Sequence, residues 1–161
     1  MGTTGAKIVG MDVKELIKLL NKALADEWLA YYQYWAGAYV VKGPMRPQVE
    51  AELREHADEE LKHANMLAER IVQLGGQPIL NPDEWAKQSH CGYEAPKDPH
   101  VKKILEQNIK GEQCAIEVYN KILEKVKGSD PITFNMVRKI MEDEVEHEED
   151  LQNILDDINL I

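Results

Sequence analysis

The sequence has too few cysteines and too few apolar runs for several classes of protein. Two cysteines in 161 residues cannot supply a disulfide framework or a four-thiolate metal site. No segment approaches the roughly 18 uninterrupted apolar residues that a membrane-spanning helix needs. The first residues, MGTTGAKIVGMD, also lack the apolar run of a secretory signal. We therefore expect a cytoplasmic protein that has no membrane partner.

Positive charge is scarce as well. The chain has 19 lysines and arginines against 29 aspartates and glutamates, which gives a formal net charge of −10. An acidic surface repels nucleic acid and attracts cations, and this argues against a nucleic-acid partner. The apolar share of 43% and the charged share of 30% are typical of one soluble, folded domain.

Apolar residues recur at steps of three and four through most of the chain, which is the period of an α-helix. The first helix follows Asp12, which forms a capping-box pattern with Glu15, and Gly43-Pro44 ends it. Gly75-Gly76 and Gly128 end the next two helices. The predicted long helices cover about residues 12–42, 48–74, 99–127 and 131–160.

A proline-rich crossover over residues 75–99 joins the second helix to the third. Within it, Asn81-Pro82 is typical of a helix start and predicts a short helix over residues 82–88. No strand pattern of adequate length occurs. We therefore predict an all-α four-helix bundle with one long crossover over residues 12–161, after a flexible arm over residues 1–11.

The informative residues are polar side chains that interrupt the apolar stripe of each helix. Every helix directs one carboxylate into the bundle, and two of these glutamates are followed, one helical turn later, by a histidine. These residues are Glu27, Glu60, His63, Glu112, Glu144 and His147. Buried carboxylates are costly unless they are neutralised, and two divalent cations would balance the four charges. Oxygen and imidazole ligands suit iron, or alternatively manganese.

The two halves of the chain repeat this pattern. Glu60 follows Glu27 by 33 positions, and Glu144 follows Glu112 by 32. Tyr34 and Tyr119 each lie seven positions after the first glutamate of their half. A repeat in which every element falls on a core face predicts a metal centre rather than solvated glutamates. We interpret His56, one heptad before His63, as a core residue or a residue that supports the ligands rather than as a ligand itself, and Glu59 as part of a solvated acidic face.

Over residues 12–160 the sequence resembles the ferritin superfamily, and Glu60-Leu61-Lys62-His63-Ala64 is similar to the second-helix motif of bacterioferritin. Di-metal proteins of this superfamily carry one glutamate on each of two helices and Glu-x-x-His on the other two. The resemblance implies two iron ions per chain. Glu27 and His63 would hold one ion, Glu112 and His147 the other, Glu60 and Glu144 would bridge, and Tyr34 and Tyr119 would orient the carboxylates.

Two departures from bacterioferritin point to a smaller relative. Leu61 stands where that family has its haem-ligating methionine, so we expect no haem. Only 14 residues follow His147, which is too few for a fifth helix. This ending resembles the Dps mini-ferritins, which form twelve-subunit shells, so we expect a homo-oligomer of that kind. Ordinary Dps proteins build the iron site between two subunits, whereas this chain carries all six ligands.

Cys91 and Cys114 match the cysteine pair of the Dps-like thioferritins. Cys114 follows Glu112 by two positions, about 200° around the helix, and should therefore face the crossover rather than the metals. The two cysteines are either a redox-active pair or simply two small buried residues, and the sequence does not decide whether they are joined.

The resemblance implies a ferroxidase that oxidises Fe(II) with hydrogen peroxide or O2, stores Fe(III) mineral in the shell and protects against oxidative stress. Some Dps proteins bind DNA through a basic arm, but residues 1–11 contain only Lys7. The alternative is a discrete di-metal redox enzyme without storage, such as a rubrerythrin-like peroxidase or a manganese catalase. A structural bundle without metal is disfavoured by the buried charges.

Overall fold

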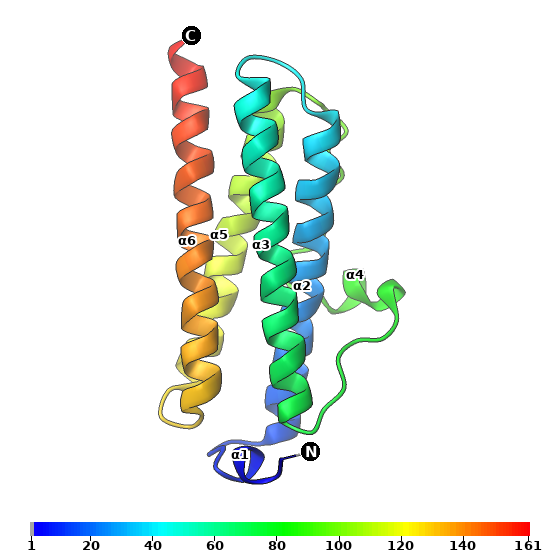
Figure 1. Cartoon of the computed structure of the whole chain (residues 1–161), viewed down its shortest axis with the longest axis vertical. Helices are drawn as coiled ribbons and strands as arrows, with labels where there is room; N and C mark the ends of the chain where they lie inside the picture. The colour runs from blue at the N-terminus through cyan, green and yellow to red at the C-terminus, as the bar shows by residue number, and fades with distance from the viewer. Residues whose placement is uncertain (1) are drawn as a thin grey trace.

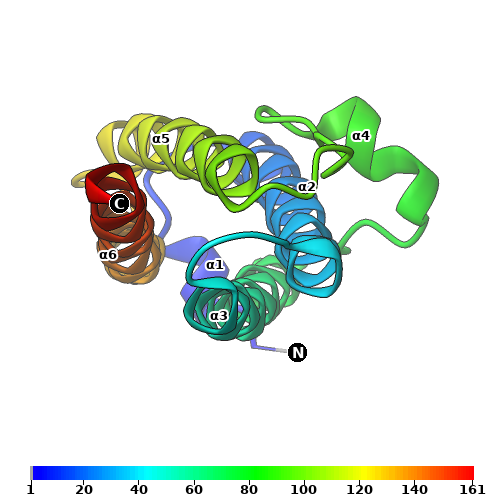
Figure 2. The same ribbon diagram turned by 90° about the horizontal axis from the view of Figure 1, so that it is seen from above.

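The computed structural model describes residues 2–161. The chain folds into a bundle of four long helices whose axes are roughly aligned (Figure 1). These are α2 (Val13–Val40), α3 (Arg46–Gln73), α5 (Val101–Val126) and α6 (Pro131–Leu160). Seen from above, they surround a common centre (Figure 2). No strand occurs between residues 2 and 161, where Lys42 and His100 form an isolated bridge. The predicted all-α four-helix bundle is confirmed.

Side chains cap the helices where the sequence predicts their starts. The Asp12 carboxylate accepts the Lys14 backbone N–H at 2.9 Å, and that of Asp130 accepts the Ile132 and Thr133 N–H groups at 3.1 Å each. The observed ends of the long helices fall within about two residues of the predicted ones.

None of the helices in the described chain is long and apolar enough to cross a bilayer.

The crossover carries the predicted short helix, as a 3₁₀ turn, η1 (Pro82–Glu84), followed by α4 (Trp85–Gln88). Both views place α4 against α2, where Trp85 stacks on Trp28 with ring centroids 5.3 Å apart (Figures 1 and 2). Because the crossover returns the chain to the opposite end of the bundle, α5 runs in the same direction as α3.

A single helical turn, α1 (Thr4–Lys7), lies below the bundle within the segment predicted to be a flexible arm. The Gly10 N–H donates to the Ser129 carbonyl at 2.7 Å, next to the turn between α5 and α6. Flexibility of residues 1–11 and the domain boundary at residue 12 stay predictions.

The bundle core consists of two apolar clusters separated by a polar layer. One cluster includes Leu20, Leu67 and Ile140, and the other includes Leu53, Leu105 and Leu151. On each long helix, the residues of one cluster precede the inward glutamate and those of the other follow it. The fold therefore places the predicted site residues in one layer, closed above and below by apolar side chains.

A buried ion pair joins the end of α3 to the start of α6. Arg70 Nη2 lies 3.0 and 2.8 Å from the two carboxylate oxygens of Asp130, and Arg70 Nε donates to Thr133 Oγ1 at 2.8 Å. Arg70 and Asp130 are both buried. Burial alone would raise the pKa of Asp130, but its hydrogen bonds with Thr133 and Arg70, together with the Arg70 charge, lower it.

We expect Arg70→Met to lower the free energy of unfolding by about 3 kcal/mol, because it leaves a buried carboxylate without its partner. Arg54→Met is the matched control: Arg54 pairs with Glu50 on the surface, and its loss should cost less than about 1 kcal/mol. Urea unfolding at neutral pH measures both. Equal losses in the two variants would show that the Arg70 pair contributes no more than a surface pair.

Candidate metal centre

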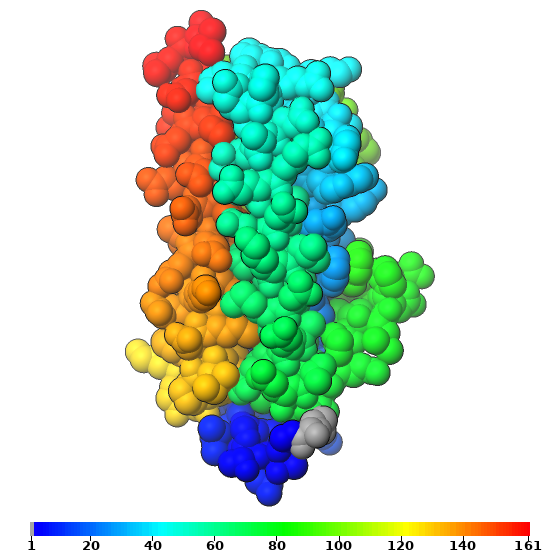
Figure 3. Space-filling model, viewed as in Figure 1, coloured from blue at the N-terminus to red at the C-terminus, as the bar shows by residue number. Residues whose placement is uncertain are grey.

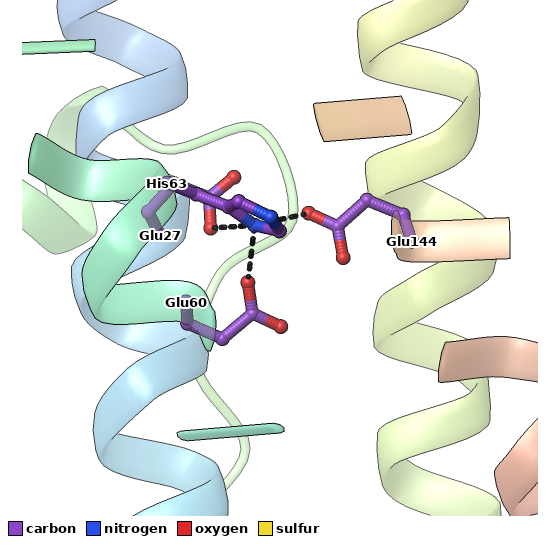
Figure 4. A group of neighbouring side chains, drawn as sticks. All are labelled: Glu27, Glu60, His63 and Glu144. Carbon is purple, nitrogen blue, oxygen red and sulfur yellow. Dashed lines mark hydrogen bonds and ion pairs between the residues drawn. The ribbon is translucent and has the colours of Figure 1, made fainter. Parts of the chain in front are cut away.

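All six predicted ligand residues meet in the polar layer. Glu27 comes from α2, Glu60 and His63 from α3, Glu112 from α5, and Glu144 and His147 from α6. Each is at most 3% exposed. Figure 4 shows Glu27, Glu60 and Glu144 converging on the ring of His63. The inward face predicted from helical periodicity is therefore the face that the structure presents to the bundle centre.

The six residues form two overlapping groups that share two glutamates. In the first, His63 Nδ1 lies 3.1 Å from Glu60 Oε2, 3.4 Å from Glu144 Oε1 and 3.6 Å from Glu27 Oε2. In the second, His147 Nδ1 lies 3.4 Å from Glu60 Oε1, 3.3 Å from Glu144 Oε2 and 3.8 Å from Glu112 Oε1. Glu60 and Glu144 thus turn one oxygen towards each group, as a carboxylate bridging two cations must.

Each histidine is held from outside by an acidic residue of the other half of the chain. His63 Nε2 lies 2.9 Å from Asp143 Oδ2, and His147 Nε2 lies 2.5 Å from Glu59 Oε2. A carboxylate that accepts the Nε2–H leaves the Nδ1 lone pair directed at the centre. The interpretation of Glu59 as part of a solvated face is wrong, because its side chain is only 32% exposed and contacts His147.

Sequence periodicity did not single out Asp143. The signal was nonetheless present, because an acidic residue directly precedes the glutamate in both Glu-x-x-His motifs: Glu59 before Glu60, and Asp143 before Glu144. Such a residue lies about 100° from the inward glutamate around the helix, and periodicity alone assigns it to the surface.

Two buried tyrosines connect the halves of the centre crosswise. The Tyr34 hydroxyl of α2 donates to Glu112 Oε1 of α5, and the Tyr119 hydroxyl of α5 donates to Glu27 Oε1 of α2. Burial and the adjacent carboxylate charges raise the pKa of both tyrosines well above the ordinary value, so they stay protonated donors. Each tyrosine fixes the orientation of one carboxylate that belongs to a single group.

Burial raises the pKa of most of the carboxyl groups. Desolvation, with the charges of Glu27 and Glu112, raises the pKa of Glu60 to about 8. Desolvation and neighbouring carboxylates likewise raise the pKa values of Glu112 and Glu144. Burial acts in the same sense on Glu27, but the adjacent imidazole of His63 and its charge outweigh burial and lower the pKa of Glu27.

The pKa values of the two histidines are raised, whereas burial ordinarily lowers the pKa of a histidine. Burial alone lowers the pKa of His63, but the adjacent carboxylates of Glu144, Glu27 and Glu60 outweigh it and raise the pKa. Burial is likewise outweighed at His147, where contacts with Glu144 and Glu60 raise the pKa to about 12. Without metal, protons on these groups hold the clustered carboxylates together.

The donor set fits two divalent cations. Among residues 2–161, four buried atoms of these residues have no hydrogen-bond partner: Glu27 Oε2, Glu60 Oε1, Glu144 Oε2 and His147 Nδ1. All four face the centre, and buried polar atoms normally have partners. Carboxylate oxygens and imidazole nitrogens are suitable ligands for iron or manganese.

The two cysteines are joined. Cys91 of the crossover and Cys114 of α5 form a disulfide, with Cα atoms 5.8 Å apart. This confirms that Cys114 faces the crossover. Asp26, next to Glu27 on α2, fixes the same loop by accepting the backbone N–H groups of His90 and Cys91 at 2.8 and 2.9 Å. A redox function for the pair stays a prediction.

Comparison with known proteins gives matches that extend along nearly the whole chain. Residues 17–161 match the family described as ferritin-like domain. A DNA protection during starvation protein from Pyrococcus furiosus is 31% identical over 147 residues, covering 91% of this chain and 80% of the relative. A bacterioferritin from Desulfovibrio desulfuricans is 29% identical over 141 residues, covering 87% and 74% respectively.

Solved structures agree with these matches. A dodecameric thioferritin, the bacterioferritin-related protein from Bacteroides fragilis, is 44% identical, with a TM-score of 0.96 over 98% of this chain and 95% of that chain. Dps from Thermosynechococcus elongatus has 20% identity and a TM-score of 0.83, covering 95% of both chains, and shares the fold.

We expect the metal-free protein to lose stability as pH rises from 6.5 to 8. The raised pKa of His147 stabilises the fold fully below the unfolded value of 6.5, and this contribution declines as pH rises towards about 12. The contribution of Glu60 to the free energy of unfolding is complete below its ordinary pKa of 4.5, and it is lost as pH rises to its folded-state pKa of about 8. Urea unfolding should show a decrease of at least about 1 kcal/mol per pH unit.

Protein loaded with Zn(II) is the control for this prediction. Its stability should rise with pH over the same interval, because the metal competes with the protons on these ligands. A metal-free protein equally stable at both pH values would contradict the charge assignment.

Tyr119→Phe and Tyr34→Phe should each weaken Zn(II) binding about 10- to 100-fold, because a ligand carboxylate loses the donor that orients it. Tyr32→Phe serves as the control, since Tyr32 is half-exposed and stacks on Trp35 outside the core. Isothermal titration calorimetry measures the three affinities. If all three match that of the unaltered protein, the tyrosines do not act on the centre.

Proposed function

The chain belongs to the ferritin-like domain family, and on that premise we propose that it is a ferroxidase that oxidises Fe(II) and stores the Fe(III) product in an oligomeric shell. The observation that carries this proposal is the arrangement of Glu60 and Glu144. Each of these carboxylates has one oxygen near His63 and the other near His147. This arrangement supports two cations held side by side within one subunit. Relatives that match include a bacterioferritin and a DNA protection during starvation protein.

In the proposed centre, two Fe(II) ions are the substrate. Glu27 and His63 bind one ion, Glu112 and His147 bind the other, and Glu60 and Glu144 bridge the two. Six ligand side chains leave coordination positions free for an oxidant. Binding displaces the protons that the histidines hold in the metal-free protein, while Asp143 and Glu59 keep each ring oriented through Nε2.

The oxidation releases two electrons, one from each Fe(II). Hydrogen peroxide accepts both, its O–O bond breaks, and with two protons it leaves as two molecules of water. O2 would accept the same two electrons and, with two protons, leave as hydrogen peroxide. The buried layer restricts the reacting pair to one polar space between two apolar clusters. Consuming Fe(II) and peroxide together would protect against oxidative stress.

We propose a homo-oligomeric shell, of twelve subunits, as the storage compartment. The dodecameric thioferritin from Bacteroides fragilis matches 98% of this chain at 44% identity. The outer face of α2 exposes a run of adjacent aromatic rings, Tyr32, Trp35 and Tyr39, which are 50%, 41% and 58% exposed. An exposed aromatic patch of this kind is typical of a surface that another subunit covers.

Stepwise addition of Fe(II) and peroxide to the metal-free protein tests the storage function. Absorbance of Fe(III) and soluble iron per chain are followed at each step. Soluble, oxidised iron far beyond two ions per chain supports a mineral-storing shell. Saturation at two would instead indicate the alternative, a discrete di-metal redox enzyme, and manganese would then be tested as its metal.

Glu144→Gln should slow the initial oxidation of the first two Fe(II) ions per chain by at least about 100-fold, because it removes a bridging ligand and unbalances the charge. Glu146→Gln is the matched control, since Glu146 is an exposed residue of the same helix. Stopped-flow absorbance gives both rates. Normal initial rates in Glu144→Gln would refute the proposed role of this residue.

A further inference from the structure

A second group of potential ligands lies outside the six-residue centre, between α3 and α6. It consists of Glu52 and His56 on α3 and Asp150 on α6. His56 Nε2 lies 3.1 Å from Glu52 Oε1 and 3.9 Å from Asp150 Oδ2. One ligand atom from each residue falls within 4.8 Å of the others. Figure 3 shows α3 and α6 side by side on this face of the molecule.

Packing fixes the imidazole of His56 and aims it at the two carboxylates. The side chain is 2% exposed, and its ring stacks on that of His147 with centroids 4.0 Å apart. The ring of Tyr34 meets it edge to face at 5.3 Å. Nε2 is the ring nitrogen that lies near Glu52 and Asp150. The other ring nitrogen, Nδ1, has no hydrogen-bond partner within residues 2–161. A buried polar side chain is thus directed into an acidic group that solvent can reach.

The negative charge of this group lacks a basic partner. Among the described residues, no lysine or arginine lies within ion-pair distance of Glu52 or Asp150. Partial burial and the charges of Asp150 and Glu55 raise the pKa of Glu52. The side chains of Glu52 and Asp150 are 26% and 43% exposed, so a cation can reach them without rearrangement of the helices.

We propose that Glu52, His56 and Asp150 form a third metal site, which binds one divalent transition-metal cation through the two carboxylates and His56 Nε2. The cation would neutralise both carboxylates, and mixed oxygen and imidazole ligands suit Fe(II), Mn(II), Co(II) or Zn(II). The site shares no ligand with the six-residue centre. The identity of Fe(II) as its cation in the cell rests on the function proposed above, whereas metal binding does not.

Co(II) binding to the assembled, metal-free protein tests this site. In a Glu60→Gln/Glu144→Gln background, which disables the six-residue centre, about one Co(II) per chain should remain bound. Adding Glu52→Gln/Asp150→Asn should weaken that remaining binding at least about 10-fold. Adding Glu69→Gln/Asp157→Asn instead removes the same charge from exposed residues of the same two helices and should leave it unchanged. Equilibrium dialysis gives the number bound and the affinity.

Two results would overturn the proposal: unchanged Co(II) affinity in Glu52→Gln/Asp150→Asn, or an equal loss in the control pair, which would mean diffuse binding to acidic residues. His56→Gln provides a second variant, and it should weaken binding while circular dichroism shows unchanged helix content. Failure of the proposed function is separable. If Glu60→Gln/Glu144→Gln binds as much Co(II) as the unaltered protein, the six-residue centre is not a metal site, but the remaining ion can still be assigned to the third site.

Discussion

Four carboxylates buried in one layer, between two apolar clusters, are the constraint on which the rest of the structure depends. Carboxylates in such a layer repel each other and lack solvent, so the fold needs positive charge there. In the metal-free protein this charge comes from protons, because the pKa values of His63 and His147 are raised and the pKa of Glu60 is about 8. Two divalent cations would replace those protons at the same atoms.

Each half of the chain supplies two of the four glutamates and one of the two histidines, and side chains of each half contact ligands of the other. Tyr34 of the first half binds Glu112 of the second, and Tyr119 of the second binds Glu27 of the first. The outer partners of the histidines cross over as well, since Asp143 holds His63 and Glu59 holds His147. Because each half orients ligands of the other, the centre forms only when both helical hairpins pack together.

Sequence periodicity predicted the helices and all six residues of the centre, because an inward-facing glutamate is conspicuous in an apolar stripe. It placed Glu59 on the surface and overlooked Asp143, since residues at the edge of a stripe can either face solvent or turn towards a neighbouring helix. Sequence spacing does not decide whether the disulfide forms, because the path of a 25-residue crossover depends on contacts such as that of Asp26 with His90 and Cys91. Such contacts depend on tertiary packing, which local spacing does not encode.

Anomalous diffraction from crystals of the iron-loaded protein tests the central claim most directly. The account predicts two iron peaks in each subunit, on either side of the line that joins the Glu60 and Glu144 carboxylates, with one peak beside His63 and the other beside His147. Iron found only outside this polar layer, with the six side chains still paired to one another, would contradict the account.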